Sequence, residues 1–214
     1  MNLIKLRKKD DPIQREVDKG FDDDGMSPMA PPDAYDPPGE SQGVPYEAMH
    51  PVMQAYRDEH DAFSKVLAEF RAALDKMKTD GLDHAADATI REFFRCLDED
   101  VFPHNRREEK VLFPLLAERL LAAGEHSKGP TPTTAVDALE DDHDQILQLG
   151  ALTFNLFGVA SRLPDEKSRK MVFDAAVGQG IELAELLRLH IFREDHVVFS
   201  LAHQHITTAE FDRM

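Results

Sequence analysis

The sequence predicts an all-α protein: an up-down four-helix bundle with a proline-rich N-terminal arm and a short C-terminal helix. Three observations predict this class. From Pro51 onward, apolar residues recur at steps of three and four, which is the period of amphipathic helices. No segment alternates apolar and polar residues as a half-buried strand would. The links between the periodic segments are short or rich in turn residues, which favours antiparallel neighbouring helices.

The first 49 residues differ from the rest of the chain. Seven of the 13 prolines lie between Pro28 and Pro51, among many Asp and Gly residues. Proline breaks helices and central strands, so this segment is predicted to be either a disordered arm or an extended strap over the domain. Both alternatives stay open. We therefore expect an arm over residues 1–49 and a helical domain over residues 50–214.

The first two helices are delimited by their end signals. The first is predicted over residues 51–79, with Pro51 in its first turn and Gly81 beyond its end. The second is predicted over residues 85–122, ending before Gly124.

The second half of the domain gives two further long helices and a short one. They are predicted over residues 133–161, over residues 165–204, and after Thr207, where Glu210 has the spacing of a capping box. Within the second helix, Pro103 and Pro114 predict a kink or a break. Irregular helical turns of this kind are common where a site is shaped.

Composition and charge exclude several classes of function. The net charge of −16 disfavours nucleic acid and anionic membranes as partners. The single cysteine, Cys96, excludes an intrachain disulfide and is expected to be a buried, inert thiol. With no secretory signal and no apolar run of membrane-spanning length, we expect a cytoplasmic protein.

A pattern of polar residues occurs twice along the chain. The segment "HNRREEKVLFPLL" from His104 matches "HIFREDHVVFSLA" from His190, at an offset of 86 residues. One helix earlier in each half, "RDEHDAF" carries His60 and "EDDHDQI" carries His143, at an offset of 83 residues. Each half therefore has one His on its first helix and His-x-x-x-Glu on its second, so the internal repeat is a helix hairpin.

Helix geometry places these residues in the predicted core. A step of four residues turns a helix by a net of only about 40°, so Glu108 and Glu194 share a face with their histidines. Glu109 and Asp195 do not, and are predicted to face solvent or a subunit. The predicted inner stripes of the second and fourth helices are Leu97, Val101, His104, Glu108, Val111, Leu115 and Leu183, Leu187, His190, Glu194, Val197, Leu201. Those of the first and third are Met53, Tyr56, His60, Phe63, Leu67, Phe70 and Val136, Leu139, His143, Ile146.

Four histidines and two glutamates that converge in a core predict a metal centre. Two ionised carboxylates in an apolar interior are costly unless cations compensate them, and no Lys or Arg lies on these stripes. A polar layer that fixes helix register would leave the two carboxylates unexplained. Imidazole and carboxylate without thiolate suit Fe or Mn, and Zn less specifically. The predicted metal ligands are His60, His104, Glu108, His143, His190 and Glu194.

The number of ligands predicts an open position on each metal. If both glutamates bridge two ions, each ion receives about four protein ligands, whereas iron in such sites favours about six. An oxide or hydroxide bridge would fill one more position on each ion. The remaining room would admit a small ligand such as O₂, peroxide or NO.

These motifs resemble the hemerythrin-like family of HHE cation-binding domains, in which a His and a His-x-x-x-Glu-Glu segment with an "LFP"-like run occur twice. The resemblance covers roughly residues 50–204 and implies a four-helix bundle with two iron ions held by the six residues above. The chain departs from oxygen-carrying hemerythrins at Leu147, where they have His, and at Glu194, where they have Asp. These departures argue against simple oxygen storage.

The resemblance leaves two classes of function to weigh. One is a non-haem di-iron protein that binds or processes O₂, peroxide or NO, with or without turnover. The alternative is an iron- or redox-responsive regulatory or binding module without turnover, whose residues 1–49 contact a protein partner or the chain itself.

Two residues that break the symmetry of the repeat suggest finer roles. Tyr56, one turn before His60, could hydrogen-bond a ligand of the metals, or could be an ordinary core tyrosine. Gly150, two turns after His143, could open a pocket or tunnel, or could allow close helix packing. The remaining six histidines are predicted to be surface or capping residues.

Overall fold

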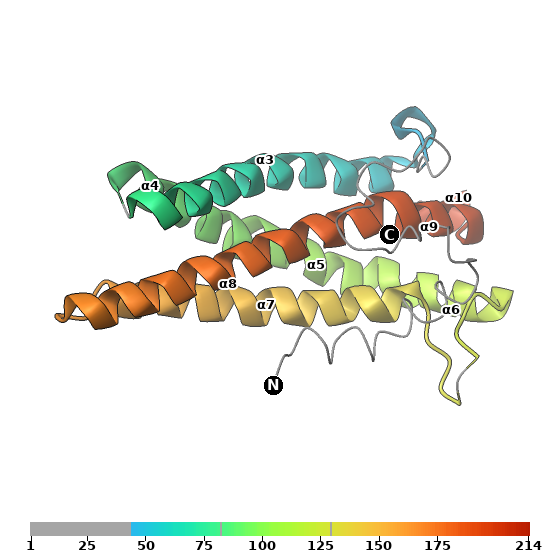
Figure 1. Ribbon diagram of the computed structural model, residues 1–214. Coiled ribbons are helices and arrows are strands. Elements are labelled where there is room, and N and C mark those ends of the chain that lie inside the picture. The colour runs from blue at the N-terminus through green and yellow to red at the C-terminus, as the bar shows by residue number, and fades with distance from the viewer. Residues whose placement is uncertain (1–43, 82, 129) are drawn as a thin grey trace, which may run out of the picture. The chain divides into compact units, whose positions relative to one another are not determined.

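The computed structural model describes residues 44–81, 83–128 and 130–214, and in these ranges it is helical with no strand (Figure 1). The predicted all-α helical bundle is thereby confirmed. Residues 1–43 lie outside the described residues, so the nature of the arm and the division at residue 49 stay predictions.

The long predicted helices are present close to their expected bounds. The α-helices are α3 (Pro51–Asp80), α4 (His84–Cys96), α5 (Phe102–Arg107), α6 (Phe113–Ala123), α7 (Ala135–Ala160), α8 (Glu166–Arg193), α9 (Phe199–His205) and α10 (Thr208–Phe211). A 3₁₀ turn, η2 (Tyr46–Ala48), precedes them. Three π-helical turns, η3 (Leu97–Val101), η4 (Glu108–Leu112) and η5 (Glu194–Val198), interrupt the second and fourth predicted helices.

The helix ends follow local chemistry. The Asp83 carboxylate caps α4 by accepting the backbone N–H of Ala86 at 2.7 Å. Gly124 ends α6 with a φ of +82°, a left-handed conformation that costs glycine little. The predicted capping box of Thr207 and Glu210 is present at α10.

The kinks predicted at the prolines take the form of π-turns. The backbone N–H of Phe102 bonds to the carbonyl of Leu97, and that of Phe113 bonds to Glu108, each five residues back. Pro103 and Pro114 are the next residues after these two donors. Proline lacks an N–H and its ring crowds the carbonyl four residues back, and a preceding wide turn relieves both problems.

The π-turns also correct the predicted core. Val111 was expected inside, but it is 38% exposed, whereas Leu112 is fully buried. In the other half Val198 is buried and Val197 is only half-buried. Leu115 and Leu201 are partly buried and pack against the core, so the prediction is wrong for Val111 and holds only in part for Val197, Leu115 and Leu201. Each π-turn holds more residues than an α-turn, so the buried stripe resumes one residue later.

The chain forms two compact units. The first comprises, among the described residues, Val44–Arg57, Arg107–Asp141 and Leu189–Met214. Its apolar core contains Met49, Met53, Tyr56, Leu112, Phe113, Leu116, Leu120, Val136, Leu139, Val198, Phe199, Ala202, Ile206 and Phe211. Two of the histidines predicted as surface or capping groups hold the start of α3 here: the backbone N–H of His50 donates to Nε2 of His203 at 3.1 Å.

The second unit comprises Asp58–Arg106 and Asp142–Arg188. In its core the rings of Phe70 and Phe93 stack with centroids 3.7 Å apart. A Cβ on Gly150 would lie 2.9 Å from Cδ2 of Leu97, so this glycine allows close packing of α7. Close packing was one of the two expectations for Gly150. Gly150 also lines a pocket of this unit, which is described below.

Candidate metal centre

Each predicted ligand comes from a regular helix or from the first residue of a π-turn. His60 lies on α3, His104 on α5, His143 on α7 and His190 on α8. Glu108 begins η4 and Glu194 begins η5, so both carboxylates are set where the helix widens. π-turns of this kind frequently occur at functional sites.

All six side chains are buried. The exposed fractions are 1% for His60, 1% for His104, 0% for Glu108, 5% for His143, 2% for His190 and 0% for Glu194. Groups of this chemistry are seldom so deeply buried without a compensating partner.

The potential ligand atoms fall into two overlapping groups, in each of which all the atoms lie within 4.8 Å of one another. One group is His60, His104, Glu108 and Glu194, and the other is Glu108, His143, His190 and Glu194. The two glutamates occur in both groups, as the predicted bridging role requires. Assignment of the six residues as ligands stays a prediction.

The geometry around His104 prepares its imidazole to bind a cation. Its Nδ1 lies 2.6 Å from Oε2 of Glu59, and its Nε2 lies 3.0 Å from Nε2 of His60. With Nδ1–H donating to the carboxylate, the lone pair of Nε2 is directed at His60. A carboxylate behind a ligand histidine fixes its tautomer and raises its basicity in many metal sites.

The fourth predicted helix supplies two potential metal-ligand atoms that lie close together. Nε2 of His190 and Oε1 of Glu194 are 3.3 Å apart, as expected for residues four apart on one helix face. A histidine nitrogen and a carboxylate oxygen at this separation can contact the same ion, because metal–ligand bonds of about 2 Å place neighbouring donor atoms about 3 Å apart.

The prediction for Asp195 is wrong. It was expected to face solvent or a subunit, but it is 6% exposed and forms an ion pair with Arg57 of α3. The π-turn alone does not explain this burial, because η4 widens the helix in the same way and the residue after Glu108 is exposed. Arg57 offsets the cost of burying the second charge. Glu109, its counterpart in the other half, is exposed as predicted.

Tyr56 lies in the apolar core of the first unit. It is 8% exposed, its ring lies 6.3 Å from that of Phe199, and the guanidinium of Arg107 lies 5.9 Å from its centroid. These contacts account for its burial as a core aromatic residue. Its proposed contact with a ligand of the metals stays a prediction.

The donor set fits a hard or borderline cation. It consists of imidazole nitrogens and carboxylate oxygens, a set that suits iron or manganese. The one thiol of the chain takes no part in either group: Cys96 is buried, and burial raises its pKa to about 11. A thiol held protonated in this way is a poor metal ligand.

Sequence reasoning missed Glu59 and the burial of Asp142, which is 3% exposed. A signal was present, because an acidic residue directly precedes the first histidine of each half, in "DEHD" and "DDHD". The 83-residue offset of the repeat relates Glu59 to Asp142. The repeat therefore extends to the acid that precedes each of these histidines.

Comparison with models of protein families gives a match over most of the chain. The family model described as hemerythrin HHE cation binding domain matches residues 52–202. No curated protein and no solved structure matches the chain. In the described part of the chain, no helix is long and apolar enough to cross a membrane.

Proposed function

Because the chain belongs to the hemerythrin HHE cation-binding domain family, we propose that its six buried histidines and glutamates hold two iron ions that bind a small oxygen or nitrogen species. Candidate ligands are O₂, peroxide and NO. The observation that carries the proposal is the sharing of Glu108 and Glu194 by both groups of potential ligand atoms. Two fully buried carboxylates that belong to both groups are the arrangement that a pair of bridged cations needs.

The residues of this chain would have distinct tasks. The four histidines would hold the ions, and the two glutamates would bridge them and balance their charge. Glu59 would orient His104 through Nδ1, and the ion pair of Arg57 with Asp195 would keep that second carboxylate out of the ligand set. When bound, the iron ions would supply Lewis-acid and redox chemistry.

Metal content tests the proposal. The full-length protein, reconstituted with Fe²⁺ without oxygen and desalted, should carry about two iron ions per chain by elemental analysis. His104→Ala and Glu194→Gln should each lower that content, whereas His84→Ala, which changes an exposed histidine at the start of α4, should not. An iron-free wild type, or full iron content in both site variants, would refute the proposal.

Absorption spectra identify the exogenous ligand. Iron-loaded protein should change its visible spectrum on addition of at least one of O₂, peroxide or NO, because an open coordination position admits such molecules. Tight iron binding with no spectral response to any of the three would leave iron binding intact and contradict the small-ligand proposal.

A regulatory module is the second candidate, and the 51 residues before the family match give it a place for a partner. Deletion of residues 1–48 separates the two functions. If iron content and reactivity are unchanged while a partner is lost, the arm has a regulatory role. If reactivity is lost with the arm, the arm belongs to the iron chemistry.

A further inference from the structure

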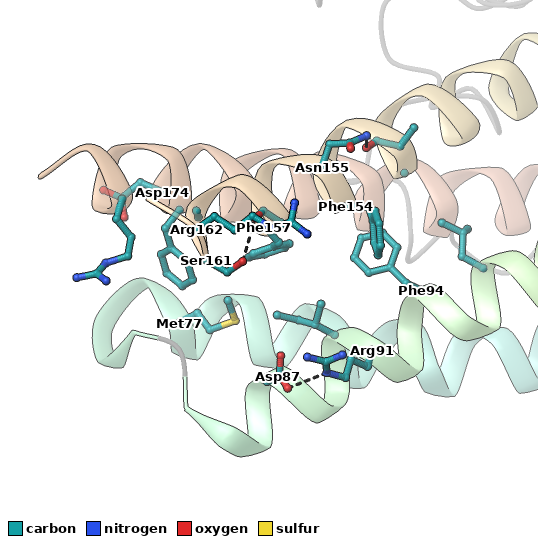
Figure 2. Close-up of a pocket in the computed structure, with 18 of the residues that line it drawn as sticks. Met77, Asp87, Arg91, Phe94, Phe154, Asn155, Phe157, Ser161, Arg162 and Asp174 are labelled. Carbon is teal, nitrogen blue, oxygen red and sulfur yellow. Dashed lines mark hydrogen bonds and ion pairs between the residues drawn. The ribbon is translucent and has the colours of Figure 1, made fainter. Parts of the chain in front are cut away.

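A large pocket lies within the second unit, apart from the proposed ligands. It has a volume of about 1230 Å³ and is formed by α4, η3, α7 and the first half of α8, with the end of α3 (Figure 2). Its apolar lining includes Phe94, Leu147, Ala151, Phe154, Phe157 and Phe173. Concave apolar surfaces with a few polar groups are the usual form of a small-molecule site.

The pocket is long. Its lining residues on α7 run from Leu147 to Ala160, a span of about 20 Å at the helical rise of 1.5 Å per residue, and continue to Arg162 in the turn that follows. Along this length Leu147 is 52% exposed and Phe154 is 60% exposed. Large apolar side chains gathered in one exposed groove commonly mark a binding surface. An extended apolar chain would cover them better than a compact molecule would.

The charge of the lining is opposite to that of the whole protein. The lining has six Lys or Arg residues and four Asp or Glu residues, whereas the chain has 25 and 41. Two of the four acids are already paired: Asp87 lies 2.8 Å from Arg91, and Asp174 lies 2.9 Å from Lys170.

Two cations at one end of the pocket are available to an anion. Arg162 follows α7 and Arg169 lies on the second turn of α8, and neither forms an ion pair in the part of the chain that the structure describes. Arg169 is close enough to Asp165 to help lower the pKa of that carboxyl, whose hydrogen bonds come from Ser168. Lys78 and Glu166 also line this end, while the other unpaired acid, Asp98, lies on η3 with Leu97. In Figure 2, Arg162 and Ser161 lie between Asp174 on one side and Phe94 and Phe154 on the other.

We propose that this pocket binds a long-chain carboxylate of the fatty-acid class. The apolar chain would lie along Phe94, Phe154 and Phe157, and the carboxylate would contact Arg162 and Arg169. Guanidinium groups bind carboxylates through two parallel hydrogen bonds, which gives the head group a fixed end. The proposal does not depend on the proposed iron function.

Fluorescence titration of the full-length protein with cis-parinaric acid, a fluorescent fatty acid, tests the contacts of the carboxylate and those of the hydrocarbon tail separately. The acid should saturate one site per chain, and its uncharged methyl ester should bind about tenfold more weakly, because it loses a charge-assisted hydrogen-bonded pair. The double variant Arg162→Gln/Arg169→Gln should bind the acid as weakly as the ester. The double variant Lys65→Gln/Lys167→Gln, an equal loss of charge at exposed positions of α3 and α8 outside the lining, should keep the wild-type preference.

A second variant tests the location. A Cβ on Gly158, which lines the pocket, would meet nothing within 4 Å, so Gly158→Phe should fill the pocket without disturbing the helix and abolish binding of both acid and ester. Helicity and iron content should be unchanged. Unaltered binding in Gly158→Phe, or equal affinity for acid and ester, would overturn the proposal. So would a dimer in solution that dissociates in Gly158→Phe, since a second copy would then be the occupant.

Discussion

Glu59 contributes no atom to either group of potential ligands, yet its carboxylate selects which nitrogen of His104 carries the proton. The neighbouring Arg57 has a comparable task, because it neutralises the buried Asp195. Both residues act through another side chain. Their positions on α3, one and three residues before His60, place the supporting contacts beside the first histidine of the repeat.

Glu59→Gln should weaken iron binding by about 10–100-fold without removing a ligand, because the amide no longer fixes the tautomer of His104. Competition with a chelator at constant pH measures the affinity. The matched control is Glu69→Gln on the exposed face of α3, which should leave the affinity unchanged. Equal affinity in wild type and Glu59→Gln would show that His104 is oriented by other contacts.

Cys96 should resist thiol reagents while the protein is folded. It is 5% exposed, and burial, assisted by the nearby Asp100, raises its pKa to about 11, so very little thiolate is present at pH 8. Labelling with iodoacetamide should be slow in buffer and fast in denaturant. Equally fast labelling in the folded state would contradict the burial of this thiol.

At the scale of the elements, the π-turns separate what the sequence could predict from what it could not. The spans of the long helices followed from apolar periodicity, Pro51, Gly124 and the Thr207 cap, which are local signals. Val111 and Val197 were placed inside because the periodicity argument assumes a constant number of residues per helical turn. A π-turn holds more residues, so it shifts the buried stripe by one position. Pro103 and Pro114 signalled an irregularity, but a proline does not specify whether the chain kinks, breaks or widens.

Leu112→Ala should lower the free energy of unfolding by about 2–5 kcal/mol, because it empties a fully buried site. Leu115→Ala, the same change at the position that an uninterrupted helix would bury, should cost less than half as much. Urea unfolding of both variants under identical metal loading gives the comparison. The reverse order would mean that η4 is a regular turn in solution.

The short helix α10 should be sensitive to acid. Hydrogen bonds from Arg119 and from the backbone of Thr207 lower the pKa of Glu210 from 4.5 to about 2. A lowered pKa stabilises the folded state above pH 4.5, and this contribution is lost as the pH falls from 4.5 towards 2. Glu210→Gln should therefore lose less of the stability of α10 as the pH falls through this range. Hydrogen exchange of the backbone amides in residues 206–214 measures this loss. The control Glu125→Gln, at an exposed loop position, should retain the wild-type slope.

At the scale of the whole molecule, stability and metal content should be linked. The burial of four histidines and two glutamates is costly without cations, so the metal-free protein should be less stable than the metal-bound one. The sequence predicted this chemistry because the repeat placed six polar residues on apolar stripes. It could not predict Glu59 as a partner of His104, or the extent of the pocket beside α7 beyond the suggestion made by Gly150, because both depend on contacts between different helices.

Removal of metal by a chelator should lower Tm by about 5–10 °C, since binding at a hundredfold excess over Kd adds about 2.7 kcal/mol to a domain of this size. Differential scanning calorimetry before and after chelation, and after addition of Fe²⁺, measures the change. His104→Ala should show a smaller difference between the two states. Identical Tm values with and without metal in the wild type would show that the buried groups are compensated within the chain itself.

The wide turns at Glu108 and Glu194 set a condition for anyone who would transplant this set of side chains into an idealised designed scaffold. If the same sequence were grafted onto a regular helix, every residue after the glutamate would be rotated about 100° around the helix axis relative to its position here. Leucine side chains meant for the interior would then point into water. A successful graft must therefore copy the five-residue π-turns along with the histidines and glutamates.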